Sequence, residues 1–159
     1  MFNLSGEVDM ISELEKKILK SLNENARKSF REVAKEVGTS TTAIYNNVKK
    51  MEKRGLLLGY VPAVDEELLG FTLTAIIAMR VSQGKLFSVY DKVIKYPEVR
   101  EIYDLTGEWD AILVCFFQRR RDLDNFLKTK LNLPHIERVT THVVLNVIKD
   151  EKRAFIEAL

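Results

Sequence analysis

The sequence predicts an α+β protein, in which three short helices are followed by a sheet domain with the element order βαββαβ. Two observations lead to this prediction. Apolar residues recur at helical spacing through the first third of the 159 residues. From residue 71 onward, apolar runs rich in β-branched residues alternate with two helical segments. Strands and helices in this split order are typical of a ferredoxin-like domain.

The first two helices are predicted by their N-terminal caps. Ser12 is followed three residues later by Glu15, and Ser29 is followed in the same way by Glu32. A serine and a glutamate at this spacing form a capping box, in which each side chain bonds the other residue's backbone N–H. An apolar stripe at helical spacing accompanies each box: Ile11, Leu14, Ile18 and Leu22 for the first, and Phe30, Val33, Ala34 and Val37 for the second.

A third helix is predicted after a tight turn at Gly38, with Ser40 or Thr39 as its cap. At about 100° per residue its apolar side chains fall within one narrow arc. The opposite side is polar and basic, which is what a helix that reads DNA from a helix-turn-helix requires. An ordinary amphipathic helix with a solvated face is the alternative, and the two preceding helices favour DNA binding. The apolar side consists of Ile44, Val48 and Met51, and the candidate DNA-binding residues are Thr41, Thr42, Tyr45, Asn46, Lys49, Lys50 and Lys53.

Charge supports this interpretation through its distribution. The net charge of +2 is too small to indicate a nucleic-acid partner by itself. Residues 1–62, however, contain 11 Lys and Arg against 8 Asp and Glu, whereas residues 63–159 contain 14 against 15. The segment Thr41–Arg54 has four basic residues and one acidic residue. The positive charge therefore gathers where DNA would bind.

The second half of the chain predicts the sheet domain. We expect the domains to be 1–58, a helix-turn-helix of the winged type, 59–70, a linker, and 71–159, the ferredoxin-like domain. A short strand is predicted within Gly55–Val61, and Pro97 and Pro134 follow the two helices of the sheet domain. The predicted strands are 71–81, 99–105, 111–117 and 137–148; the predicted helices are 85–95 and 122–131, with a further short helix within 152–159.

Two of the predicted strands are apolar on both faces. In 111–117 and in 73–81, the residues that alternate toward opposite faces are equally apolar. A sheet covered by helices on one side needs only one apolar face. We therefore expect a second copy of the chain to cover the other face, which predicts a homodimer.

The sequence contains no catalytic or metal-binding pattern. His135 and His142 lack the partners of a metal site, and a single cysteine excludes zinc-finger ligation. The seven glycines are scattered, so neither a phosphate loop nor a dinucleotide motif exists. The basic run Arg119–Arg121 is interpreted as a solvated surface, with a contact to DNA or a partner as the alternative. We expect a non-enzyme with no cofactor and no metal.

Other features indicate a cytoplasmic protein. No apolar run of 18 residues exists, so no membrane span is expected. The segment Met1–Met10 lacks the basic start and apolar core of a signal peptide. Cys115 lies in an apolar run and is interpreted as a packed thiol.

Several segments together resemble the Lrp/AsnC (feast/famine) regulators over nearly the whole chain. The resemblance implies a winged-type helix-turn-helix, a linker strand and a ferredoxin-like domain that senses a small molecule. It also implies dimers that assemble into tetramers, octamers or larger rings. The matching segments are Glu13–Leu19, Val33–Gly55, Gly59-Tyr60, Ile136–Arg138 and Thr106–Asp110, which is similar to the family's Thr-Gly-x-x-Asp.

The resemblance also indicates an effector site for an amino acid. Gly107 would leave room for a ligand close to the main chain, Asp110 would accept its ammonium group, and Thr141 would add a hydroxyl contact. A plain hairpin turn is the alternative. The sequence departs from the family at Asn46 and Asn47, where many members have Ser or Arg, and at Val139, where amino-acid-binding members often have Thr.

The sequence therefore predicts a transcriptional regulator that binds double-stranded DNA and responds to a small effector such as an amino acid. Two alternatives remain open. One is an enzyme of related fold, a tetrapyrrole decarboxylase. The other is a metabolite-sensing module in which the helix-turn-helix serves only assembly.

Overall fold

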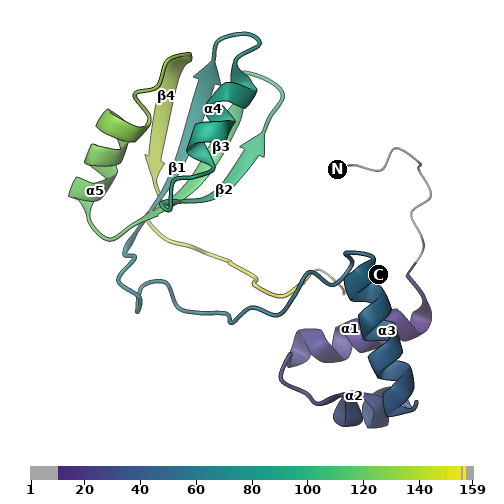
Figure 1. Cartoon of the computed structure of the whole chain (residues 1–159). Helices are drawn as coiled ribbons and strands as arrows, with labels where there is room; N and C mark the ends of the chain where they lie inside the picture. Colours follow the sequence, from purple (N-terminus) through teal and green to yellow (C-terminus); the bar gives the residue numbers. More distant parts are fainter. Residues whose placement is uncertain (1–10, 155, 157–159) are drawn as a thin grey trace. The chain divides into compact units, whose positions relative to one another are not determined.

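Three helices form the N-terminal part of the computed structural model, which describes residues 11–154 and 156 (Figure 1). They are α1 (Glu13–Glu24), α2 (Phe30–Val37) and α3 (Thr41–Lys53). Both predicted capping boxes are present, at Ser12 with Glu15 and at Ser29 with Glu32. Gly38 ends α2 with φ +77°, a left-handed conformation that glycine adopts without steric cost. The turn between α2 and α3 is therefore set locally by the sequence.

The helices enclose their own hydrophobic core. Ile18, Val33, Ile44 and Met51 are each 0% exposed, and Val48 is 1% exposed. These positions come from all three helices, so the predicted stripes are confirmed. Partly buried apolar residues surround this core, namely Ile11, Leu14, Phe30, Val37 and Leu57.

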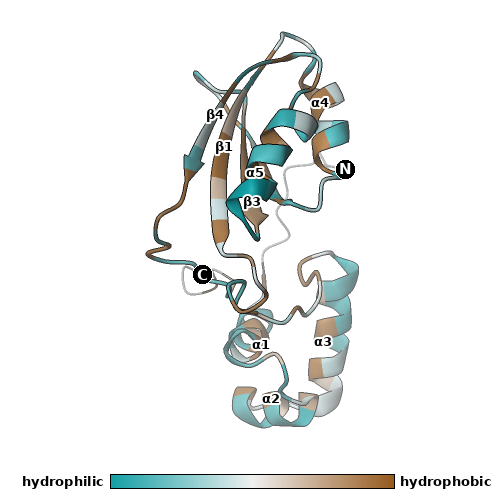
Figure 2. Ribbon diagram, turned by 90° about the vertical axis from the view of Figure 1, so that its left-hand side faces the viewer, coloured by the Kyte–Doolittle hydropathy of each residue, from teal (hydrophilic) through white to brown (hydrophobic). Residues whose placement is uncertain are grey.

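The second part of the chain is a four-stranded antiparallel sheet in the order β2-β3-β1-β4. Both helical segments lie on one face of it (Figures 1 and 2). This is the ferredoxin-like βαββαβ arrangement that the sequence predicts. The elements are β1 (Leu73–Val81), α4 (Leu86–Val93), β2 (Val99–Asp104), β3 (Ala111–Phe117), α5 (Arg120–Asn125), η1 (Phe126–Lys130) and β4 (Ile136–Val143).

The central strands are apolar on both faces, as predicted. Side chains of β3 alternate between fully buried positions toward the helices and half-buried positions on what we call the outer face. On the outer face of β3 lie Ile112, Val114 and Phe116. Val114 is paired with Ile76 of β1, which is 37% exposed. The described part of one chain leaves this outer face partly open.

The predicted helix 122–131 is two different helices in the structure. It begins as α5 and continues as the π-helical turn η1, in which the Leu131 N–H donates to the Phe126 carbonyl at 3.1 Å. In an uninterrupted α-helix these residues would lie about 140° apart around the axis. The wider turn lets both be buried, with Phe126 1% and Leu131 3% exposed.

Three predicted elements at the ends of the domains differ from the structure. The strand expected within 55–61 is absent, and turn and irregular backbone replace it. The last strand ends at Val143, earlier than predicted. The Val144 N–H still donates to the Thr74 carbonyl at 2.9 Å, but β1 begins at Leu73, so residues 146–148 have no strand to pair with. Residues 151–154 and 156 are not helical, and the remainder of the helix predicted in 152–159 lies outside the described residues.

The chain divides into two compact units, and each is considered by itself. One, the helical unit, contains the described residues up to Ala63 together with those from Glu151 onward; the other, the sheet unit, contains Val64–Asp150. The sequence analysis assigned residues 151–159 to the sheet domain, whereas the described ones among them group with the helices. Among them, Ala154 is bonded to Asn23 of α1, and Ile156 is buried in the core of the helical unit.

Candidate DNA-binding surface and effector site

Helix α3 presents a polar face to solvent because its apolar face is fully used in the core. The Ser40 hydroxyl caps the helix by accepting the Ala43 N–H at 3.1 Å. Ile44, Val48 and Met51 are buried against α1 and α2. All seven residues that are predicted to bind DNA are exposed. Thr41 is the first residue of the helix, and the other six follow along its polar side: Thr42, Tyr45, Asn46, Lys49, Lys50 and Lys53.

Two side chains of this surface have contacts within the protein. The Lys49 ammonium lies 2.8 Å from the Glu52 carboxylate, and this hydrogen bond raises the pKa of Lys49. The Tyr45 ring packs edge-on against Phe30, with 6.2 Å between ring centroids. Tyr45 therefore joins α3 to α2 while the residue itself remains 49% exposed. The neighbouring Asn47 bonds its own helix, since its amide donates to the Ala43 carbonyl at 2.8 Å.

The fourth basic residue of the segment, Arg54, is part of the structure beneath the surface. Its guanidinium donates to the Glu15 carboxylate at 2.9 Å, and the Glu15 side chain is only 2% exposed. Burial opposes the charge on Glu15, but hydrogen bonds from Ser12 and the positive charges of Arg54 and Lys50 outweigh it, so the pKa of Glu15 is lowered. The pair joins the start of α1 to the end of α3.

The sequence reasoning missed this pair as a functional feature. It assigned Glu15 only to a capping box and counted Arg54 only as a positive charge. The two residues are 39 positions apart. No local spacing signals such a contact, because only the packing of the three helices brings the two ends together.

The turn between β2 and β3 holds two of the three predicted effector residues. Gly107 has φ +118°, which side-chain-bearing residues rarely adopt. Asp110 ends the turn, and its carboxylate Oδ2 accepts the Val81 N–H at 2.7 Å. The Asp110 main chain also donates to the Met79 carbonyl and accepts from the Leu105 N–H. Asp110 thus has a structural function at the end of β1.

The third predicted effector residue lies apart from these two. Thr141 of β4 is paired with Ile77 of β1, and Ile77 is paired in turn with Leu113 of β3. Strand β1 therefore lies between Thr141 and the strand that follows Asp110. The structure brings Gly107 and Asp110 together on one turn and does not bring Thr141 to them within the described part of the chain.

Three residues that were not among the predicted effector residues connect the turn to β4. The Arg138 guanidinium lies over the Trp109 ring, 4.9 Å from its centroid. It also lies 3.6 Å from the Glu108 carboxylate. A cation held by an aromatic face and a carboxylate links the two elements that bear the predicted effector residues.

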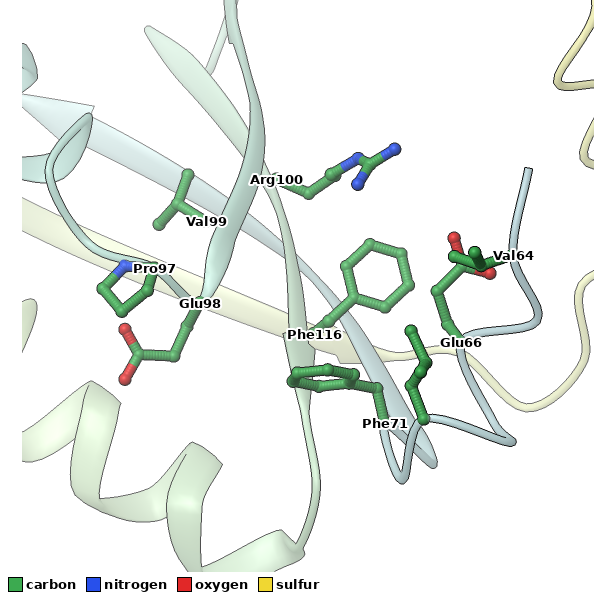
Figure 3. Close-up of a pocket in the computed structure, with 9 residues that line it drawn as sticks. Val64, Glu66, Phe71, Pro97, Glu98, Val99, Arg100 and Phe116 are labelled. Atoms are coloured by element: carbon green, nitrogen blue, oxygen red, sulfur yellow. The ribbon is translucent and has the colours of Figure 1, made fainter. Parts of the chain in front are cut away.

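A pocket of about 220 Å³ opens in the sheet unit, at the end of β3 away from that turn (Figure 3). Figure 3 shows Phe71, from the segment before β1, and Phe116, from β3, projecting into it, with Arg100 of β2 nearby. None of the predicted effector residues lines this pocket.

The described residues contain no group of three or more potential metal ligands. Cys115 is fully buried, and burial together with the charge of Glu98 raises the pKa of its thiol to about 12. The thiol is therefore protonated at neutral pH, as expected of a packed side chain. Among the described residues, no helix has both the length and the apolar character needed to cross a membrane.

A capped, basic, outward-facing helix on a three-helix core, joined to a ferredoxin-like domain, defines a DNA-binding regulator with a separate sensing domain. Known proteins agree with this class. Residues 11–57 match the winged helix-turn-helix DNA-binding family, and residues 74–154 match the Lrp/AsnC ligand binding domain. The chain belongs to the Lrp/AsnC family of transcriptional regulators.

Individual relatives extend over nearly the whole chain. An HTH-type transcriptional regulator of Pyrococcus abyssi is 39% identical over 145 residues, which cover 91% of this chain and 98% of the relative. The structure of AsnC from E. coli has a TM-score of 0.85 and 26% identity, covering 89% of this chain and 97% of that one. A transcriptional regulator from Neisseria meningitidis, solved as a complex with L-Met, has a TM-score of 0.82 and 26% identity, covering 91% and 96%.

Proposed function

We propose that this regulator acts as a homodimer in the cytoplasm, reads paired sites in double-stranded DNA with α3, and responds to an amino acid. We also propose that it has no enzymatic activity. One observation carries the DNA-binding part: α3 buries its apolar side completely and exposes every side chain that the sequence selected for DNA. A polar and basic helix on a rigid support can enter the major groove.

Different residues of α3 have different functions in this proposal. Asn46 is exposed near the middle of the polar face, and an asparagine amide can pair with both N6 and N7 of adenine. Lys49, Lys50 and Lys53 supply positive charge for phosphates, which contributes affinity without sequence preference. Lys49 must exchange its Glu52 partner for a phosphate, whereas Lys53 lies one turn further along the helix.

The variants Asn46→Ala and Lys53→Ala are expected to separate these functions. Asn46→Ala should cost about 1–3 kcal/mol on the cognate site and leave affinity for random DNA nearly unchanged. Lys53→Ala should weaken both DNAs alike and reduce the salt slope by about one unit. Fluorescence anisotropy with the chain's own promoter region and a shuffled control, across a salt series, measures both effects.

Lys35→Ala is a matched control for this experiment, because Lys35 is an exposed lysine of α2 outside the candidate surface. Equal losses for Asn46→Ala on cognate and random DNA would remove Asn46 from the base-reading face. Failure of the unmodified protein to shift its promoter region or any other duplex would instead favour a metabolite-sensing module whose helices serve only assembly.

The outer face of the sheet supports a dimer. Ile76, Ile112, Val114 and Phe116 form a continuous apolar surface on the central strands, and the two helical segments cover only the opposite face. A second copy of the chain has the same apolar surface and can bury it symmetrically. Two α3 helices in one dimer would then contact half-sites about one helical turn, or a multiple of it, apart.

The effector site rests on the turn Gly107–Asp110. Oδ2 of Asp110 is engaged by the Val81 N–H, and we assign its other carboxylate oxygen to the ammonium group of an amino acid. The complex of the Neisseria relative with L-Met supports an amino acid as the ligand class. Because β1 separates Thr141 from the turn, we propose that a contact between subunits completes the site, so that binding would shift assembly as well as DNA affinity.

Asp110→Asn tests this assignment, because an asparagine retains an oxygen for the Val81 N–H while losing the charge. We expect L-methionine or another common amino acid to raise the unfolding temperature of the unmodified protein. The variant should bind that amino acid about 10–100 times more weakly, because it loses one charge-assisted hydrogen bond. Calorimetry measures the affinity, and Asp91→Asn on the exposed side of α4 is the control. Unchanged affinity in Asp110→Asn would exclude the assigned role.

A further inference from the structure

The segment that follows the sheet unit is bound to α1 by a specific pair of hydrogen bonds. The Asn23 side-chain amide donates to the Ala154 carbonyl at 3.0 Å, and its oxygen accepts the Ala154 N–H at 2.9 Å. One side chain therefore satisfies both main-chain groups of a residue 131 positions away. This pairing resembles one step of a strand ladder, with a side chain in place of the second strand.

Two residues later the same segment enters the hydrophobic core of the helical unit. Ile156 is 6% exposed and belongs to the cluster that contains Ile18, Val33 and Met51. Apolar residues of the preceding stretch behave differently, since Leu145 is 90% and Ile148 is 93% exposed. The chain therefore leaves its apolar side chains in solvent after β4 and buries one only where it reaches the helices.

We propose that residues 151–154 and Ile156, here called the clasp, anchor a second covalent tether that holds the helix-turn-helix domain to the sheet domain, with Asn23 and Ile156 as its positioning residues. The first tether, from Lys53 to Leu73, spans 20 residue steps. The second, from Val143 to Ala154, spans 11. At no more than about 3.6 Å per step, the first allows a reach of about 70 Å and the second about 40 Å.

The shorter tether limits how far the DNA-binding domain can move from the sheet domain. This shorter tether starts at the end of β4, the strand that contains Thr141. Strand β4 is therefore part of the sheet and is also connected along the chain to the clasp. This inference rests on the proposed function in one respect: in a dimer, two clasped domains would bridge a narrow range of half-site spacings, whereas unclasped domains would tolerate a wider range.

Distance measurement between two spin labels tests the tether without DNA, so that its outcome is independent of the DNA-binding proposal. Cysteines replace Lys35 of α2 and Asp91 of α4, both exposed, in the full-length chain. The native Cys115 is fully buried and does not compete for the label. Dilution with unlabelled protein confines the signal to labels within one chain.

We expect Asn23→Ala and Ile156→Ala each to broaden the distance distribution toward longer values. Asn146→Ala and Ile148→Ala, exposed residues of the same types between β4 and the clasp, are matched controls and should leave it unchanged. A second measurement uses duplexes in which the half-sites are moved apart by one to five base pairs. The ratio between the affinities for the preferred spacing and for the other spacings should be at least tenfold smaller in the clasp variants than in the unmodified protein. An unchanged distance distribution in both clasp variants would overturn the proposal.

Ile156→Ala removes a core side chain and can unfold the helical unit, so a second design leaves the clasp intact. A specific protease site inserted after the exposed Asn146 allows the connection to be cut in the folded protein. Cutting should broaden the distance distribution while the thermal unfolding of the helical unit stays within a few degrees. A distribution that remains narrow after cutting would show that the clasp only completes the core and does not tether the domains.

Discussion

Val114→Asp is expected to convert the proposed dimer into monomers and to weaken binding to paired half-sites by about a thousandfold or more. Val114 lies on β3, a central strand, with its side chain on the outer face of the sheet. In a dimer that buries this face, two carboxylates would be removed from water without partners, at a cost of several kcal/mol each. About 4 kcal/mol corresponds to a factor of about a thousand in affinity. Sedimentation velocity and titration of a duplex with two half-sites measure the two effects.

The position of the substitution decides its effect. From the sequence, the expected test of the interface is a charge at Phe117 or Leu113, whichever lies on the outer face. The structure corrects this choice, because both side chains point toward the helices, with 2% and 0% exposure. A charge there would unfold the sheet domain and would not test the interface. Ile94→Asp, at a 70% exposed position after α4, is the control for adding a charge elsewhere. A Val114→Asp protein that sediments as the same dimer would exclude the outer face as the interface.

Arg54→Met is expected to lower the free energy of unfolding of the helical unit by about 3 kcal/mol. The substitution removes the guanidinium that lies 2.9 Å from Glu15 and leaves a carboxylate that is 2% exposed. Breaking a buried pair by removing one partner costs about 3–5 kcal/mol, and the lower value applies here because Ser12 continues to bond Glu15. DNA affinity should fall with stability, since the pair with Glu15 joins the end of α3 to the start of α1. Urea unfolding followed by circular dichroism measures the change.

The double variant Glu15→Met with Arg54→Met separates the ion pair from general packing. It should recover most of the stability that Arg54→Met loses, because a buried pair and an apolar replacement of similar volume are often equivalent. Acid dependence gives a second measurement. The pKa of Glu15 is lowered in the folded state, so its stabilisation is present above about pH 4.3 and is lost as the pH falls through the folded pKa. The Arg54→Met protein should lose less stability over this pH range than the unmodified protein. An identical pH profile would mean that Arg54 does not stabilise the charge of Glu15.

The sequence by itself determined the features that depend on neighbours within a few positions. Ser12 with Glu15 and Ser29 with Glu32 form capping boxes because the two residues of each pair meet in the first turn of any helix. The spacing of Ile44, Val48 and Met51 set which face of α3 is buried and, by exclusion, which face is exposed to solvent. The alternation in 111–117 likewise predicted two apolar faces of the sheet. Periodicity and capping are local properties, so they can be read from one chain.

Only the tertiary structure decided the features that depend on contacts between distant segments. It determined that the last strand ends at Val143, close to the point where its partner β1 begins at Leu73, and that the Asp110 carboxylate accepts the Val81 N–H. It also brought Glu15 to Arg54 and Asn23 to Ala154, pairs separated by 39 and 131 positions. Such contacts leave no mark in local spacing, since each residue taken alone is an ordinary polar side chain on a helix or at its end. The packing of whole helices and strands determines which residues become their partners. A charge or a peptide group is buried at low cost only where this packing also provides a complementary group.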